Sequence, residues 1–288
     1  MAITASAVKE LRELTSAGMM ACKKALTETN GDLEAAAKLL REKGEAKRSD
    51  RADRETSEGI VVAFVSEDSK TGVLAQVNCE TDFVAKNEAF QAFVGELVEA
   101  IAAGTATDVE SALTTPFADG TVENALGAKF TELGEVIKIS SFARFSVDAG
   151  AAASYIHMGG KVGVLIEVAT GKAETTSTAG FQELVKDITL HVAASNPAGL
   201  SREDIDGSVV EEENDINRKQ LEAAGKPANI IENILKGKIN KFYSEQCLLE
   251  QSFVKNPDIS ITQLLEAAAK DLGDTLTLVR YERFAVGA

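Results

Sequence analysis

The first 44 residues carry apolar side chains at the spacing of three short helices. Each group recurs every three or four residues, which places its members on one helix face. Glycines and polar residues predict the breaks: Gly18 as a left-handed cap, Asn30-Gly31 as a turn, Asp32 as an N-cap and Gly44 as the end of the third helix. The three apolar faces consist of Val8, Leu11 and Leu14; of Met19, Met20, Ala25 and Leu26; and of Leu33, Ala36, Ala37 and Leu40.

Met19 and Met20 are adjacent in the second helical pattern. Adjacent residues on a helix point about 100° apart, so both are not expected to face one small core. We expect one methionine to fill a gap between the helices and the other to face outward.

Residues 45–58 contain no apolar side chain larger than alanine, and their charges are mixed. Such a segment is typical of a linker or a solvated helix. We therefore predict a three-helix module over residues 1–44 and a charged linker over residues 45–58.

The remainder of the chain shows an internal duplication. KTGVLAQVNC begins at Lys70 and KVGVLIEVAT at Lys161, an offset of 161 − 70 = 91. The same offset aligns the apolar helical positions that follow. LGEVIKISSFARFSV from Leu133 matches LGDTLTLVRYERFAV from Leu272, an offset of 272 − 133 = 139. The difference, 139 − 91 = 48, is a net insertion in the second copy.

Each copy has the pattern strand, strand, helix, helix, strand, with alternation typical of a half-buried antiparallel sheet. The prediction is an α+β fold with two related subdomains, over residues 59–148 and 149–288, each carrying its helices on one face of its sheet. The insertion, at about residues 200–250, has two helical apolar patterns joined by a short turn, which predicts an antiparallel helical hairpin.

Residues 78–86 read NCETDFVAK and connect a strand-like run to a helical pattern that begins near Ala89. Thr81 or Asp82 could cap that helix. Phe83 could fold back onto the core or could anchor a partner protein, because aromatic residues on loops are frequent interface anchors. At the offset of 91 the second copy has Gly171-Lys172-Ala173-Glu174, without a ring. The fold therefore does not require Phe83, and this comparison favours the partner contact.

Composition narrows the class of protein. A net charge of −15 disfavours binding to nucleic acid or to anionic membrane. Three widely spaced cysteines form no C-x-x-C motif and indicate reduced thiols. A signal peptide and a membrane-length apolar run are both missing from the sequence, so a cytoplasmic location is expected.

Motifs of catalysis are also missing. The sequence contains neither a phosphate-binding loop nor a G-x-G-x-x-G pattern. Two histidines are too few for a convincing metal site. His191 falls on an apolar helix face, where we expect a structural role, and His157 lies in a loop-like SYIHMGG segment where a turn role is favoured. No cofactor is expected.

Several motifs, in order along nearly the whole chain, resemble bacterial elongation factor Ts, the guanine-nucleotide exchange factor of elongation factor Tu. They are VKELRELTSAGMMACKKALTETNGDLEAA, NCETDFVAKNEAF, SYIHMGGKVGVL and HVAASNP. The resemblance implies an N-terminal module similar to the ubiquitin-associated three-helix fold. It also implies that the protein binds Tu carrying GDP, disturbs the Mg²⁺ and nucleotide site, and promotes GDP release without an active site of its own.

The resemblance further implies residue roles. Thr81, Asp82, Phe83 and Val84 would enter Tu near its Mg²⁺ site, with Phe83 as the wedge. Arg12 and an outward-facing methionine, Met19 or Met20, would grip the nucleotide-binding domain of Tu, and His157 would touch Tu from the second subdomain. The helical hairpin would mediate dimerisation or contact Tu, although a self-contained hairpin fits the sequence equally well. Some family members continue into a C-terminal helix, whereas this chain stops at Ala288.

A non-catalytic scaffolding protein, which uses the duplicated core as a rigid platform, is the alternative from another class. A hydrolase or transferase is disfavoured because no recognisable nucleophile or phosphate-binding motif is present.

Overall fold

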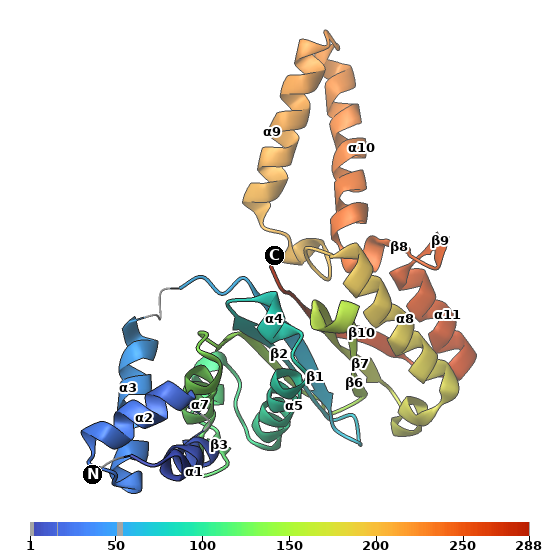
Figure 1. Ribbon diagram of the computed structural model, residues 1–288. Coiled ribbons are helices and arrows are strands. Elements are labelled where there is room, and N and C mark those ends of the chain that lie inside the picture. The colour runs from blue at the N-terminus through green and yellow to red at the C-terminus, as the bar shows by residue number, and fades with distance from the viewer. Residues whose placement is uncertain (1–2, 16, 51–53, 288) are drawn as a thin grey trace.

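A computed structural model describes residues 3–15, 17–50 and 54–287 (Figure 1). Its first unit consists of α1 (Ala5–Thr15), α2 (Met19–Glu28) and α3 (Leu33–Asp50). These helices pack around Leu11, Cys22 and Leu26, which are fully buried. Helical periodicity predicted the three helices, and the structure confirms them.

Two of the four predicted helix breaks, Asn30-Gly31 and Asp32, are confirmed. Asn30 and Gly31 both have positive φ angles, and the Asp32 carboxylate accepts a hydrogen bond from Ala35 N at 3.0 Å. The prediction for Gly18 was wrong. Its backbone is extended, with φ −61° and ψ 143°, and it is the N-cap of α2 rather than a left-handed cap of α1.

The prediction that Gly44 ends the third helix was also wrong, because α3 continues to Asp50. A Cβ placed on Gly44 would lie 2.5 Å from Thr131 Oγ1, on α7 (Val122–Leu133). The glycine therefore permits a close helix–helix approach instead of terminating a helix. This contact joins the N-terminal unit to the rest of the molecule.

The described part of the predicted linker over residues 45–58 is partly helical and contacts the core near its end. Residues 45–50 belong to α3, and residues 51–53 lie outside the described residues. Arg54 Nη1 donates to Glu80 Oε2 at 2.9 Å, and Asn78 Nδ2 donates to the carbonyl of Thr56 at 2.5 Å. The chain thus contacts the core before its first strand begins.

The first copy of the duplication forms an antiparallel sheet of order β1-β2-β5. Its elements are β1 (Glu58–Val65), β2 (Thr71–Cys79), α4 (Asp82–Ala85), α5 (Glu88–Ala103), α6 (Val109–Leu113), β3 (Pro116–Phe117), β4 (Gly120–Thr121), α7 and β5 (Lys138–Ser146).

The second copy forms an antiparallel sheet of order β10-β7-β6. Its elements are β6 (Ala151–His157), η1 (Met158–Gly160), β7 (Val162–Thr170), η2 (Ala173–Ser177), α8 (Ala179–Ser195), η3 (Arg202–Asp204), α9 (Gly207–Ala223), α10 (Ala228–Gln246), η4 (Leu248–Glu250), β8 (Ser252–Phe253), β9 (Asn256–Ser260), α11 (Ile261–Leu272) and β10 (Leu276–Ala285).

The two copies agree element by element at the offsets found in the sequence. Adding 91 to the bounds of β2 gives those of β7, and adding 139 to the bounds of α7 gives those of α11. Arg144 and Arg283, which the duplication aligns, donate to Ala102 and Ala193 carbonyls at the ends of α5 and α8, at 3.1 and 3.3 Å. A cation at a helix C-terminus satisfies its free carbonyls.

Helices cover one face of each sheet, as predicted, and the other faces of the two sheets pack against each other (Figure 1). The shared layer includes Val61 and Leu74 from the first copy and Ala152 and Leu165 from the second. Alternation along β2 explains this, because Val73, an odd-numbered position, faces α5 while Leu74 faces the other sheet. The sequence did not predict that the sheets share a core.

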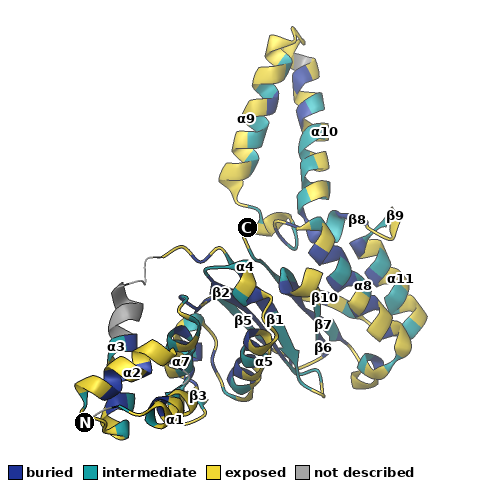
Figure 2. Ribbon diagram, viewed as in Figure 1, coloured by how far each residue is buried: buried dark blue, intermediate teal, exposed yellow. Residues whose placement is uncertain are grey.

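The insertion in the second copy is the predicted antiparallel hairpin of α9 and α10, which projects away from the two sheets (Figure 1). Ile231 and Leu235 of α10 are buried between the two helices, whereas most of the hairpin surface is exposed (Figure 2). Asn217 of α9 is also buried, and its amide oxygen accepts from Lys238 Nζ at 2.5 Å.

Candidate partner-binding site

The segment that follows β2 forms the four-residue helix α4. The Thr81 hydroxyl is its N-cap and accepts from Val84 N at 3.4 Å. The longer helix α5 has its own cap, since Asn87 Oδ1 accepts from Ala89 N at 2.9 Å. The expectation that Thr81 or Asp82 caps the helix near Ala89 was therefore wrong; Thr81 caps α4, and α5 begins at Glu88.

Phe83 lies on the solvent side of α4 and is 83% exposed. Its neighbours hold the helix to the core, because Ala85 is buried and Val84 packs against the same apolar cluster. The alternative in which Phe83 folds back onto its own core is contradicted. An exposed ring on an anchored turn has the geometry of an interface anchor.

Asp82 faces Lys86 along α4, with Asp82 Oδ2 and Lys86 Nζ 2.6 Å apart. Hydrogen bonding to Lys86 lowers the pKa of the Asp82 carboxyl, and the same bond raises the pKa of the Lys86 ammonium. Both groups therefore remain charged over a wide pH range. Asp82 presents a carboxylate next to the exposed ring.

Cys79 ends β2 just before this turn and is fully buried. Its thiol donates to the Thr81 carbonyl at 3.2 Å. Burial, with a further contribution from the negative charge of Glu135, raises the pKa of the Cys79 thiol to about 11. A thiol that stays protonated is a poor nucleophile, so its role here is packing.

The N-terminal unit exposes more apolar surface than the sequence suggested. Both Met19 and Met20 face outward, with exposed fractions of 59% and 74%, so the expectation that one methionine fills the core was wrong. Leu14, assigned to the apolar face of the first helix, is 68% exposed. Arg12 is exposed beside the buried Leu11, as expected.

His157 ends β6 and is exposed, and its Nδ1 lies 3.0 Å from the Tyr155 hydroxyl. Met158 follows it, 70% exposed and with a φ of +51°. An apolar side chain with a positive φ is uncommon. Met158 was not among the expected site residues, although a methionine beside two glycines in a turn is a usable signal. His191, by contrast, is buried as predicted.

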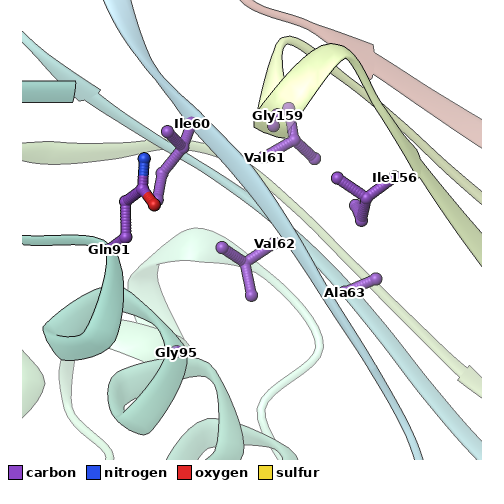
Figure 3. A pocket seen from close by; sticks show the side chains of 9 residues that line it. Ile60, Val61, Val62, Ala63, Gln91, Gly95, Ile156 and Gly159 are labelled. Atoms are coloured by element: carbon purple, nitrogen blue, oxygen red, sulfur yellow. The ribbon is translucent and has the colours of Figure 1, made fainter. Parts of the chain in front are cut away.

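A small groove of about 230 Å³ lies between β1, α5 and the connection from β6 to β7 (Figure 3). Figure 3 shows Ile60 and Val62 on β1 close to Gln91 of α5, with Ile156 and Gly159 across the strand. Gln91 Nε2 also donates to the Ala85 carbonyl at 3.0 Å, which ties the groove to α4.

The predicted site residues thus fall into separate places. Phe83 and its neighbours lie on α4, and His157 lies at the connection between β6 and β7; both segments contact β1. Arg12, Met19 and Met20 lie on α1 and α2 at a distant end of the molecule (Figure 1).

Two kinds of feature are missing from the described part of the chain. No group of three or more His, Cys, Asp or Glu side chains there could hold a metal ion. No helix within the same residues is long and apolar enough to cross a bilayer.

Comparison with known proteins points to one family. The family model described as Elongation factor TS matches residues 80–288. The elongation factor Ts of Trichlorobacter lovleyi is 44% identical over 290 residues, covering 100% of this chain and 93% of that protein. The elongation factor Ts of Clostridium perfringens strain SM101 is 45% identical over 286 residues, covering 99% and 93%. That of Nitratiruptor sp. is 43% identical over 288 residues, covering 100% and 94%.

Proposed function

We propose, because the chain belongs to the elongation factor Ts family, that it is a guanine-nucleotide exchange factor for elongation factor Tu. It binds Tu carrying GDP, disturbs the Mg²⁺ and nucleotide site, and promotes GDP release so that GTP can bind. The observation that carries the proposal is Phe83, 83% exposed on a turn whose neighbours are anchored in the core.

The physical basis is thermodynamic linkage. A protein that binds the nucleotide-free state of Tu most tightly must lower the affinity of Tu for nucleotide by the factor by which nucleotide lowers its own affinity. No covalent bond is made or broken by this chain, so it is not an enzyme with its own active site and needs no cofactor.

The exposed ring of Phe83 supplies the wedge. A preordered anchor loses little conformational entropy on binding, so more of its contact energy is available to distort the partner. Thr81 and Val84 hold the turn, and the Asp82 carboxylate, charged and paired with Lys86, perturbs the polar groups around the Mg²⁺ site of Tu.

The remaining site residues supply binding energy at a distance. Arg12, Met19 and Met20 grip the nucleotide-binding domain of Tu, and His157 contacts Tu from the second copy. Exposed methionines adapt well to a partner surface. The hairpin of α9 and α10, which exposes Val209, Ile216 and Ile230, serves dimerisation or a further contact with Tu. A role in translation elongation implies that the protein is cytoplasmic.

Release of labelled GDP from purified Tu, with and without this protein, tests the proposal. We expect release to accelerate with protein concentration and to saturate. A scaffolding protein would bind Tu and leave the rate of release unchanged, and that result would replace the exchange function by the alternative. Binding is followed separately, by titration against Tu without nucleotide.

A further inference from the structure

A carboxylate from a distant part of the chain holds the turn that carries Phe83. Glu135 follows α7, 54 residues from Thr81. Its Oε2 accepts from Thr81 N at 3.0 Å, and its Oε1 accepts from the Thr81 hydroxyl at 2.6 Å. We propose that Glu135 is a positioning residue for Phe83 in nucleotide exchange, an inference that rests on the proposed function.

The direction of the Thr81 hydrogen bonds supports this role. A carboxylate only accepts, so Glu135 makes the Thr81 hydroxyl a donor toward it. The lone pairs of that hydroxyl are then free to accept from Val84 N, which is the N-cap bond of α4. Glu135 therefore orients the group that starts the helix on which Phe83 is the second residue.

A return contact ties the same two segments together. Val136 N donates to Glu80 Oε1 at 2.9 Å, so each segment places a carboxylate on a backbone N–H of the other. Hydrogen bonds to a charged acceptor are stronger than neutral ones. Bonds on both sides of the turn hold the backbone, while the Phe83 side chain stays 83% exposed.

The second copy holds a matched contact without a ring. Asp274 takes the place of Glu135, since 135 + 139 = 274, and its Oδ2 accepts from Lys172 N at 3.1 Å and from the Thr175 hydroxyl at 2.6 Å. Lys172 and Thr175 are the counterparts of Thr81 and Val84 at the offset of 91. Both copies therefore use an acidic residue after the helix to hold the turn, but only the first turn presents a ring to a partner.

The Asp82–Lys86 ion pair does not explain the position of Phe83 in this way. It joins the first residue of α4 to the C-cap residue Lys86, and solvent reaches both side chains, at 42% and 73% exposure. Such pairs contribute little to order. Glu135 connects α4 to another part of the fold, and this distinguishes it as the positioning group.

The duplication supplies the control for the test. Glu135→Ala and Asp274→Ala each remove the carboxylate that holds one of the two turns. Thermal unfolding measures how much stability each change costs. We expect Glu135→Ala to lower the rate of GDP release at saturating protein about tenfold, the size expected for one lost charge-assisted contact. The concentration for half-saturation should change much less. Asp274→Ala should leave the saturating rate within about twofold of wild type.

A conservative variant separates positioning from folding. Glu135→Gln keeps one acceptor oxygen and the length of the side chain, so it should recover part of the saturating rate. If the wild-type protein accelerates GDP release and Glu135→Ala reaches the same saturating rate, the proposal is overturned. Equal losses of rate in Glu135→Ala and Asp274→Ala would also overturn it, because both would then reflect stability alone.

A second measurement needs no partner. The chain contains no tryptophan, so Phe83→Trp creates a single fluorescent reporter on α4. Its anisotropy should fall when Glu135→Ala is added and stay unchanged when Asp274→Ala is added. If Glu135→Ala leaves the anisotropy unchanged, Glu135 does not hold the turn that carries residue 83. A wild-type protein that fails to accelerate GDP release contradicts the proposed function instead, and leaves this anisotropy test intact.

Discussion

Phe83 and Glu174 occupy the same position in the two copies of the duplication. Each is the second residue of the short helix after the central strand, in α4 and η2 respectively, and each is exposed. The same backbone turn therefore accepts a ring in one copy and a carboxylate in the other. The ring is a property of the first turn and is not required by the fold.

Replacing Phe83 should separate exchange from folding. We expect Phe83→Ala, and Phe83→Glu copied from the second repeat, to change the free energy of unfolding by no more than about 0.5 kcal/mol, because the ring is exposed. GDP release from Tu at saturating protein should slow markedly. Phe90→Ala is the control, since Phe90 is buried and its truncation should cost about 3–5 kcal/mol. Normal exchange by Phe83→Ala would remove the wedge from the mechanism.

The two exposed methionines of α2 should contribute affinity. Met19→Ala combined with Met20→Ala should leave the melting temperature unchanged, because neither side chain belongs to the buried core. The concentration needed for half-maximal GDP release should rise about tenfold or more, with little change in the rate at saturation. Lys38→Ala, an exposed change on α3, is the matched control. Equal half-saturation in the methionine variant and wild type would place α2 outside the interface.

Gly44 should resist a substitution that usually stabilises a helix. Gly→Ala inside a helix gains up to about 1 kcal/mol, but the new methyl group would meet Thr131 Oγ1 at 2.5 Å. We expect Gly44→Ala to lower the free energy of unfolding or to detach α3 from α7. Gly237→Ala in α10, where nothing lies within 4 Å of the added Cβ, should be neutral or stabilising. Chemical denaturation of both variants checks the contrast, and a stabilised Gly44→Ala would show that the helices can separate freely.

His191 should make stability depend on pH. Val254 N donates to its Nδ1 at 3.2 Å, so the proton resides on Nε2 and points to Gln251 Oε1 at 2.9 Å. Burial lowers the pKa of His191, opposed by the bond to Gln251. The unfolded chain then binds a proton more readily than the folded one. The contribution of the neutral ring is complete above about pH 6.5 and is lost as the pH falls toward the lower folded pKa.

Urea unfolding at pH 7.5 and 5.5 measures that loss. His191→Gln should reduce the difference in unfolding free energy between the two pH values. The other histidine, His157, is exposed, and His157→Gln should leave the difference as in wild type. A difference that survives in His191→Gln would assign the pH dependence to carboxylates.

Much of the fold was predictable because the chain repeats itself. The offsets of 91 and 139 align strands and helices of the two copies in the sequence itself, and α7 and α11 follow the second offset over their full length. The packing of the two sheets was not predictable, since Leu74 and Leu165 read only as members of buried strands. Gly44 resembled a helix end because its partner, Thr131, is distant in sequence.

The candidate site was predictable in part for the same reason. Phe83 stood out because its counterpart lacks a ring. Glu135 did not stand out, because only the folded chain brings it to Thr81. The duplication did align it with Asp274, an acidic residue after a glycine in both copies, and that alignment is a signal that a sequence comparison can use. The outward position of both methionines depends on how α2 is rotated against α1 and α3, which periodicity leaves open.

The shared layer between the two sheets fixes the spacing between the two copies. Phe83 and His157 belong to different copies, but the copies are fused through Val61, Leu74 and Leu165 rather than joined by a hinge. The segments that carry Phe83 and His157 are therefore held at one distance from each other. A multidomain protein that contacts both segments must change its own domain arrangement to match that distance. The strain then falls on the partner.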